Sequence, residues 1–128
     1  MERIKKGDTV EIIAGKDAAE GRRDGRKVRG TVHRIIPAYR IDRQRRRVGR
    51  DRDKDRVVVQ GVNLITKHQR RTGDVRTQTG RIEMEGAIAL SNVMLVCPAC
   101  NKATRVQVKR FEDGSQARYC KHCGEMIR

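Results

Sequence analysis

Apolar residues in this chain occur in short runs in which they alternate with polar positions. Near the N-terminus, Val10 and Ile12 alternate with threonine and glutamate, and a later run ends at Pro37, which lacks a backbone donor. A third run, rich in β-branched residues, is interrupted by Gly61, where we expect a turn or bulge between two strands. The runs with this pattern are residues 8–13, 28–36, 56–69 and 81–96. Five or so short strands at this spacing predict a mostly β fold arranged as a small barrel.

Polar stretches that contain glycine separate these runs. Residues 14–27 carry three glycines and no large apolar side chain, and residues 67–80 are polar, so we predict that both are loops. Helix is expected to be scarce, with at most one turn near residues 90–93.

The stretch RQRRRVGRDRDKDR, residues 43–56, holds eight basic residues and three aspartates, and we expect none of its side chains to anchor a core. Two interpretations remain open. The stretch is either a solvated loop without a role, or a loop that orders against RNA while Asp51, Asp53 and Asp55 pair with neighbouring arginines or limit non-specific binding. Both interpretations predict a mobile segment in the free protein.

Composition limits the size of the core and indicates the partner. Only 36% of the 128 residues are hydrophobic, and the aromatic residues are Tyr39, Phe111 and Tyr119, so the core is small and marginal without an additional staple. Lys and Arg outnumber Asp and Glu by 31 to 16, which gives a net charge of +15 and predicts a polyanionic partner. Without a long apolar run or a signal-peptide pattern, we expect a soluble cytosolic protein with no membrane partner.

Four cysteines near the C-terminus have the spacing C-x2-C-x19-C-x2-C: Cys97, Cys100, Cys120 and Cys123. Two residues between cysteines let one tight turn present both sulfurs to a single ion, and the intervening sequence predicts a hairpin that turns at Asp113-Gly114 with type I′ geometry. Gly124 is expected to take a positive φ. The pattern predicts a zinc ribbon in which four thiolates saturate the ion, so that the zinc is structural and not catalytic.

Other interpretations of the cysteines are two disulfides, four free thiols or a redox pair. Disulfides are disfavoured inside cells, and the βαβ context of a thioredoxin-type pair is missing. His122 lies within the second cysteine pair and is expected to be a surface residue.

Charge alone does not distinguish DNA, RNA and acidic proteins as partners. Proteins that bind single strands stack bases on aromatic side chains, which are nearly absent here, and no helix suited to the major groove of DNA is visible. A small β scaffold with arginine-rich loops is suited to phosphates and to folded RNA that is recognised by shape. No constellation of catalytic residues and no nucleotide-binding loop is present, so we expect no enzymatic activity and no small-molecule substrate.

The segments KKGDTVEIIAGKD, GTVHRIIP, VVVQGVN, KHQRR and GAIALSNVMLVCPAC follow one another from about Lys5 to the C-terminal part of the chain. In this order they resemble the KOW-domain family of bacterial large-subunit ribosomal proteins numbered twenty-four. The residues that match the KOW pattern are Gly7, Asp8, Val10, Gly15, Lys16, Asp17, Gly30 and Val32. Those that match the following turn and hairpin are Gly61, Val62, Asn63, Lys67, His68 and Gln69.

This resemblance implies an SH3-like barrel that binds large-subunit (23S-type) rRNA early in assembly. It also implies a position near the exit of the nascent-chain tunnel, beside neighbouring large-subunit proteins. Combined with the basic loops, the resemblance gives a set of expected RNA contacts. These are Lys5, Lys6, Lys16, Arg22, Arg23, Arg26, Lys27, Arg45, Arg46, Arg47, Arg50, Arg52, Lys67, His68, Gln69, Arg70 and Arg71.

Two segments depart from the family pattern. Residues 18–27 and 38–56 resemble insertions, and the four cysteines are absent from some relatives. We therefore expect an RNA-binding barrel at residues 1–96 with two basic insertions, followed by the zinc ribbon at residues 97–128. The alternative function is a transcription-associated factor, because KOW domains and zinc ribbons both occur in such proteins.

Overall fold

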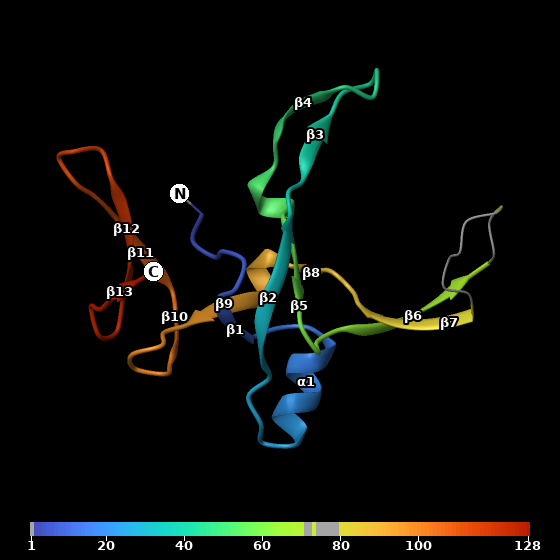
Figure 1. Cartoon of the computed structure of the whole chain (residues 1–128), viewed down its shortest axis with the longest axis horizontal. Coiled ribbons are helices and arrows are strands. Elements are labelled where there is room, and N and C mark those ends of the chain that lie inside the picture. The colour runs from blue at the N-terminus through green and yellow to red at the C-terminus, as the bar shows by residue number, and fades with distance from the viewer. Residues whose placement is uncertain (1, 71–72, 74–79) are drawn as a thin grey trace.

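A computed structural model describes residues 2–70, 73 and 80–128 of the chain, which is mostly β as the sequence predicts. Its centre is an antiparallel sheet with the strand order β10-β9-β1-β2-β5-β8. A second sheet, β11-β12-β13, is called the C-terminal sheet, and the pairs β3-β4 and β6-β7 form two hairpins. Figure 1 shows the hairpins and the C-terminal sheet extending from the centre in different directions.

The strands of the central sheet are β1 (Thr9–Ile12), β2 (Arg29–Ile36), β5 (Arg56–Val59), β8 (Ile88–Ala89), β9 (Val93–Val96) and β10 (Ala103–Thr104). The remaining strands are β3 (Tyr39–Ile41), β4 (Arg47–Arg50), β6 (Leu64–Gln69), β7 (Gly80–Glu85), β11 (Val106–Arg110), β12 (Gln116–Cys120) and β13 (Met126–Ile127). The helical segments are α1 (Lys16–Arg23) and the short 3-10 turns η1 (Arg52–Lys54) and η2 (Leu90–Asn92).

The core of the central sheet is aliphatic, as the composition predicts. Val10, Val32, Val57 and Val59 are almost completely buried and belong to one cluster. Burying each valine contributes about 1.5–3 kcal/mol to folding. Close packing of β2 on β5 requires Gly30, because a Cβ there would lie 2.6 Å from Val59 Cγ1. The apolar runs therefore identified β1, β2 and β5 correctly but missed β3 and β4, and Gly30 permits the close approach of β2 to β5.

Helix α1 corrects the prediction that residues 14–27 form a loop. Asp17 lies in its first turn and two arginines lie in its last, an arrangement that complements the helix dipole. The helix packs through Ala18 and Gly21, which are buried. A Cβ at Gly21 would meet Val28 Cγ2 at 2.6 Å, so the helix can approach β2 only where it has no side chain. Alanine and glycine make this helix contact, and they are too small to produce a recognisable apolar pattern in the sequence.

The expectation that residues 43–56 are mobile is not matched by the structure. Strands β3 and β4 pair with each other, and the hairpin tip, residues 42–46, is held by Asp42. The Asp42 carboxylate accepts hydrogen bonds from the backbone N–H groups of Gln44 and Arg46 at 2.9 and 2.8 Å. Arg45 takes a φ of 60°, a conformation that costs a non-glycine residue about 1 kcal/mol. The arginine-rich segment is therefore folded as a hairpin with a hydrogen-bonded turn.

The base of this hairpin is fixed by Asp55, which is only 2% exposed. No side chain of residues 43–56 joins a hydrophobic core cluster, as expected, but the burial of Asp55 was not anticipated. Its carboxylate accepts hydrogen bonds from the Ala38 backbone N–H and from Arg50 Nη2, each at 2.8 Å. Arg50 Nη1 also donates to Glu2 at 2.8 Å. Asp51 pairs with Lys54 at 3.6 Å and not with an arginine, and Asp53 forms no ion pair with the described residues, so of the three expected arginine pairs only that of Asp55 is present.

The polar stretch 67–80 begins as strand and not as loop. Strand β6 continues to Gln69 and pairs with β7, with Lys67 opposite Ile82 and His68 opposite Arg81. None of the helices in the described part of the chain has the length and apolar character needed to cross a membrane.

The buried Asp55 carboxylate predicts acid sensitivity. Burial alone would raise its pKa, but the Ala38 N–H and the Arg50 guanidinium outweigh burial and hold the pKa below its usual value. The carboxylate therefore stabilises the fold fully above about pH 4, its unfolded pKa, and this contribution is lost as the pH falls through the lower folded pKa. We expect Asp55→Asn to cost about 1–3 kcal/mol at neutral pH.

Urea unfolding of both proteins at a series of pH values measures this difference. The free-energy gap between wild type and Asp55→Asn should be constant at neutral pH and shrink in acid. A gap that does not change with pH would show that the Asp55 charge contributes nothing.

Candidate metal centre and nucleic-acid interface

The four cysteines lie on two turns with the same backbone design. In the first knuckle, residues 97–101, the Asn101 N–H donates to the Cys97 carbonyl at 2.8 Å. In the second knuckle, residues 120–124, the Gly124 N–H donates to the Cys120 carbonyl at 3.0 Å. The fifth residue of each knuckle has a positive φ, 54° at Asn101 and 76° at Gly124. The sequence predicted this conformation at Gly124, whereas the equivalent role of Asn101 was missed.

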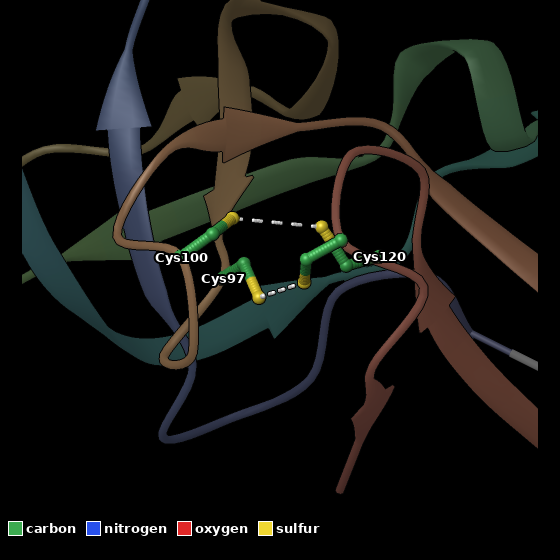
Figure 2. A group of neighbouring side chains, drawn as sticks. Cys97, Cys100 and Cys120 are labelled. Atoms are coloured by element: carbon green, nitrogen blue, oxygen red, sulfur yellow. Dashed lines mark hydrogen bonds between the residues drawn. The ribbon is translucent and has the colours of Figure 1, made fainter.

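The sulfur atoms converge on one point, although they come from segments far apart in the chain. Cys97 follows β9 and Cys120 ends β12, and the two knuckles face each other (Figure 2). The Cys97 and Cys123 sulfurs lie 3.6 Å apart, the Cys100 and Cys120 sulfurs 3.8 Å apart, and all four lie within 4.8 Å of one another. Four sulfurs about 2.3 Å from a tetrahedral ion would be separated by about 3.8 Å. The group can therefore hold a metal ion.

The same distances do not fit two disulfides. A disulfide joins its sulfurs at about 2.05 Å, and the four cysteines are free. His122 is exposed, as expected for a surface residue, and its backbone N–H points to the Cys120 sulfur at 3.4 Å.

Electrostatic coupling among the thiols favours a cation at the centre. The backbone N–H groups of Cys123 and His122 stabilise a Cys120 thiolate and lower the pKa of that thiol to about 6. The Glu125 N–H lowers the pKa of the Cys123 thiol, but desolvation and the other thiols outweigh it and raise that pKa to about 12. The cluster thus takes a first negative charge readily and resists further ones. A divalent cation would remove this resistance.

Arg29 fastens the first knuckle to the central sheet. From strand β2, its Nη1 donates to Asn101 Oδ1 at 2.8 Å and its Nη2 to the Asn101 carbonyl at 3.1 Å. Its Nε donates to Glu11 on the neighbouring strand β1 at 3.1 Å. Because one planar guanidinium makes all three bonds, the position of the knuckle is set by the sheet.

Arg118 fastens the C-terminal sheet at a second point. It is completely buried on β12, and its guanidinium donates to both carboxylate oxygens of Asp8. It also donates to the backbone carbonyls of Arg3 and Arg128, at 2.9 and 2.6 Å. Neither Arg29 nor Arg118 was singled out from the sequence, where each resembles an ordinary surface arginine.

The hairpin between the cysteine pairs is present, but its turn differs from the prediction. A type I′ turn needs positive φ at two residues, and only Gly114 has it, at 85°. The turn spans residues 111–115, with the Gly114 N–H donating to the Phe111 carbonyl at 3.0 Å. The Asp113 carboxylate accepts from the Ser115 hydroxyl at 2.7 Å and from the Ser115 N–H at 2.9 Å, and both bonds lower the pKa of Asp113.

The expected RNA contacts do not form one patch. Lys5 and Lys6 lie in the turn before β1, and five more basic residues lie on α1 and the turn after it. Others lie on the β3-β4 hairpin and in η1, and the rest lie on or just after β6. All of them within the described residues are exposed, except Gln69, which is half-buried, and Arg71 lies outside the described residues. The members on α1 and the following turn are Lys16, Arg22, Arg23, Arg26 and Lys27, and those on the hairpin and η1 are Arg45, Arg46, Arg47, Arg50 and Arg52.

Some of these side chains have partners within the chain. Arg26 pairs with Asp24 at 2.9 Å, and both terminal nitrogens of Arg50 are bound to carboxylates. Lys67 and His68 are neighbours on a strand and therefore face opposite sides of the β6-β7 hairpin. Arg40 and Arg43, also exposed on the β3-β4 hairpin, were not among the expected contacts.

Comparison with known proteins supplies the family. A family model described as "Large ribosomal subunit protein uL24, C-terminal domain" matches residues 62–127. The large ribosomal subunit protein uL24 of Fervidobacterium nodosum is 44% identical over 126 residues, which cover 98% of this chain and 95% of that protein. The uL24 proteins of Thermotoga maritima and Halothermothrix orenii are 43% and 42% identical over 98% of this chain, covering 96% and 97% of their own lengths.

The chain belongs to the uL24 family. This family is structural and not enzymatic, so the expectation that the chain is not an enzyme is confirmed. The comparisons give no support to the transcription-associated alternative. The matched region of this uL24 family member runs from the turn before β6 into β13 and includes all four cysteines.

The Arg29 bonds give a testable prediction for this uL24 family member. Arg29→Ala should free the Asn101 side chain and carbonyl, so the first knuckle should open more often. We expect the metal-free thiols of Cys97 and Cys100 to react several-fold faster with a thiol reagent, measured by mass spectrometry of modified peptides. Arg110→Ala, in the C-terminal sheet, is the control and should leave the rates unchanged. Equal rates in Arg29→Ala and wild type would mean that the sheet does not hold the knuckle.

Proposed function

We propose that the chain, as a uL24 constituent of the large ribosomal subunit, binds large-subunit RNA through its exposed basic segments. The observation that carries the proposal is the β3-β4 hairpin, which extends from the centre of the molecule and presents a series of arginines (Figure 1). The carboxylate at its tip, Asp42, is engaged by backbone N–H groups. The hairpin therefore presents cations to a partner with little competition from its own acidic groups.

Arginine suits this role because its planar guanidinium donates two parallel hydrogen bonds to a phosphate. The tip is also preformed, because Asp42 holds its turn and Asp55 holds its base. A preformed arm loses less conformational entropy on binding than a loop that must order. This argument favours recognition of folded RNA by shape and phosphate contact.

The finer parts of the proposal rest on the family resemblance. They are an SH3-like KOW barrel at residues 1–96, binding early in assembly and a location near the exit of the nascent-chain tunnel among other large-subunit proteins. The zinc ribbon proposed at residues 97–128 rests instead on the spacing of the four cysteines and on the convergence of their sulfurs. A ribosomal role places the chain in the cytoplasm.

The ion proposed for the cysteine site is structural Zn²⁺, held by Cys97, Cys100, Cys120 and Cys123. Tetrahedral coordination by four sulfurs is typical of structural zinc and leaves no open position for a substrate or water. Bound zinc would offset part of the negative charge of the thiolates and join the two knuckles.

RNA binding can be tested by its dependence on salt. Replacing Arg43, Arg45 and Arg46 with glutamine removes the cations of the hairpin tip and keeps the turn residue Asp42. If each contacts one phosphate, the slope of log affinity against log salt should become shallower by about 2–3. Filter binding to a large-subunit RNA fragment at several potassium chloride concentrations measures this slope.

The matched control for the tip variant replaces three exposed basic residues of the C-terminal module, Lys102, Arg110 and Lys121, and so removes the same net charge. An equal change of slope in both variants would indicate non-specific attraction, and no change in the tip variant would contradict the proposal.

Zinc binding can be tested by metal content. The wild-type protein should contain one zinc per chain, and Cys100→Ser or Cys123→Ser should lose it and destabilise the C-terminal sheet, since metal binding and folding are coupled in such modules. His122→Ala is the control, because it removes the nearest other possible ligand. Retention of zinc by both serine variants, or its loss in His122→Ala, would mean that the four sulfurs are not the ligands.

A further inference from the structure

One face of the β3-β4 hairpin combines an aromatic ring, an aliphatic side chain and a cation. Tyr39 and Ile41 are two residues apart on β3 and so point to the same side. Arg47 on β4 lies opposite Ile41, beyond a register shift between Arg40 and Ile41, and its contact with the Tyr39 ring places it on the same side. The guanidinium carbon of Arg47 lies 4.7 Å from the centre of the Tyr39 ring. We call these three side chains the Tyr39–Arg47 face.

This face is open to solvent. Tyr39 is 41% exposed and Ile41 is 67% exposed. Eight large hydrophobic side chains of the described residues are exposed, and three of them, counting Val48, lie on this one hairpin. Exposing these apolar groups to water is unfavourable, so a partner that covers them would bind with a gain in stability.

The charges around the face restrict the class of partner. Arg50 at the base of the hairpin is held by Asp55 and Glu2, and Asp42 at the tip is held by backbone N–H groups. The cations of Arg40, Arg43 and Arg47 are not in ion pairs with described residues. The partner must therefore offer flat apolar surface and negative charge together.

An unpaired nucleotide meets both conditions. Its base has a flat face that stacks on aromatic rings and guanidinium planes, and its phosphates match the neighbouring arginines. A regular RNA duplex presents phosphates but keeps its base faces stacked on one another, so it would leave Tyr39 and Ile41 uncovered. A protein surface with enough carboxylates to match the arginines would have little flat apolar area.

We propose that the Tyr39–Arg47 face is a stacking site for an unpaired RNA base, at a bulge or loop of the bound RNA. This inference rests on the proposed RNA-binding function and specifies what one of its contacts recognises. The arginines of the tip hold the flanking phosphates, and the ring and guanidinium hold the base. The hairpin thus distinguishes an irregular RNA helix from a regular one.

The test uses the full chain and two RNA stem-loops of identical length. One carries 2-aminopurine as a single bulged nucleotide, and the other carries it base-paired. The wild type should bind the bulged RNA about 5- to 100-fold more tightly than the paired RNA, the range expected for one stacked base. Stacking should also quench the fluorescence of the bulged 2-aminopurine.

Three variants locate the effect. Tyr39→Leu should abolish the preference and the quenching, whereas Tyr39→Phe should retain both. Tyr119→Leu is the matched control, because Tyr119 also lies under a cation, 4.6 Å from Lys109 Nζ, but in the C-terminal sheet. It should behave like the wild type. Circular dichroism and thermal melting confirm that each variant is folded.

Each outcome bears on the two proposals separately. Equal binding of both RNAs by the wild type, without quenching, overturns the stacking site and leaves RNA binding by the arginines intact. A bulge preference that persists in Tyr39→Leu also overturns the site, and would leave this face to a protein neighbour. Failure to bind either stem-loop at low salt overturns the proposed function itself.

Discussion

The buried pair of Arg118 and Asp8 is the contact on which the arrangement of this molecule depends. The Asp8 carboxylate accepts from Arg118 and also from the Lys5 backbone N–H at 2.7 Å, so it fixes the turn that leads into β1. Removing either partner would leave an unpaired buried charge, which typically costs about 3–5 kcal/mol. The pair orients the C-terminal sheet against the central one, while Arg29 locks the first knuckle. The position of the C-terminal sheet follows from these two guanidinium groups.

Sequence reasoning succeeded where a feature follows from regular alternation or fixed spacing. The alternation of Val10 and Ile12 with polar residues predicted β1, and the run of β-branched residues predicted β5, whose valines are all buried. The four cysteines predicted a convergent site because two short turns can present paired sulfurs to one point. Both signals are local in the sequence and need no knowledge of the tertiary fold.

The features that were missed depend on contacts between distant residues or on the absence of a side chain. Helix α1 packs through Ala18, which belongs to the core cluster, and Gly21, which lies against the segment just before β2, and neither leaves an apolar periodicity in the sequence. Asp55 looked like a solvated charge within a basic run, and only the return of the chain to Ala38 makes it a buried acceptor. Arg118 could not be distinguished from other arginines, since its partner lies 110 residues away.

The turn at the tip of the β3-β4 hairpin and the turn in the C-terminal sheet have the same backbone hydrogen bonds but different residues. In residues 42–46 and 111–115, the first residue exchanges backbone hydrogen bonds with the fourth and fifth, and the fourth has a positive φ. Gly114 occupies this position in the C-terminal sheet, and glycine adopts a positive φ without steric strain. Arg45 occupies it at the basic tip, where the strained positive φ belongs to a residue that carries a cation. Under the proposed function, the turn at the basic tip is the one that contacts RNA.

The pairing of β1 with both β2 and β9 has a consequence for the order in which the chain folds. As the polypeptide is synthesised, the central sheet cannot close until β9 has been made, and non-local pairings of this kind form slowly. The β3-β4 hairpin depends mainly on contacts close in sequence, such as that of Asp55 with Ala38, 17 residues away, and its longer contact, from Arg50 to Glu2, reaches a residue that is synthesised earlier. The arginine-bearing arm can therefore form first, on a nascent chain whose body is still open.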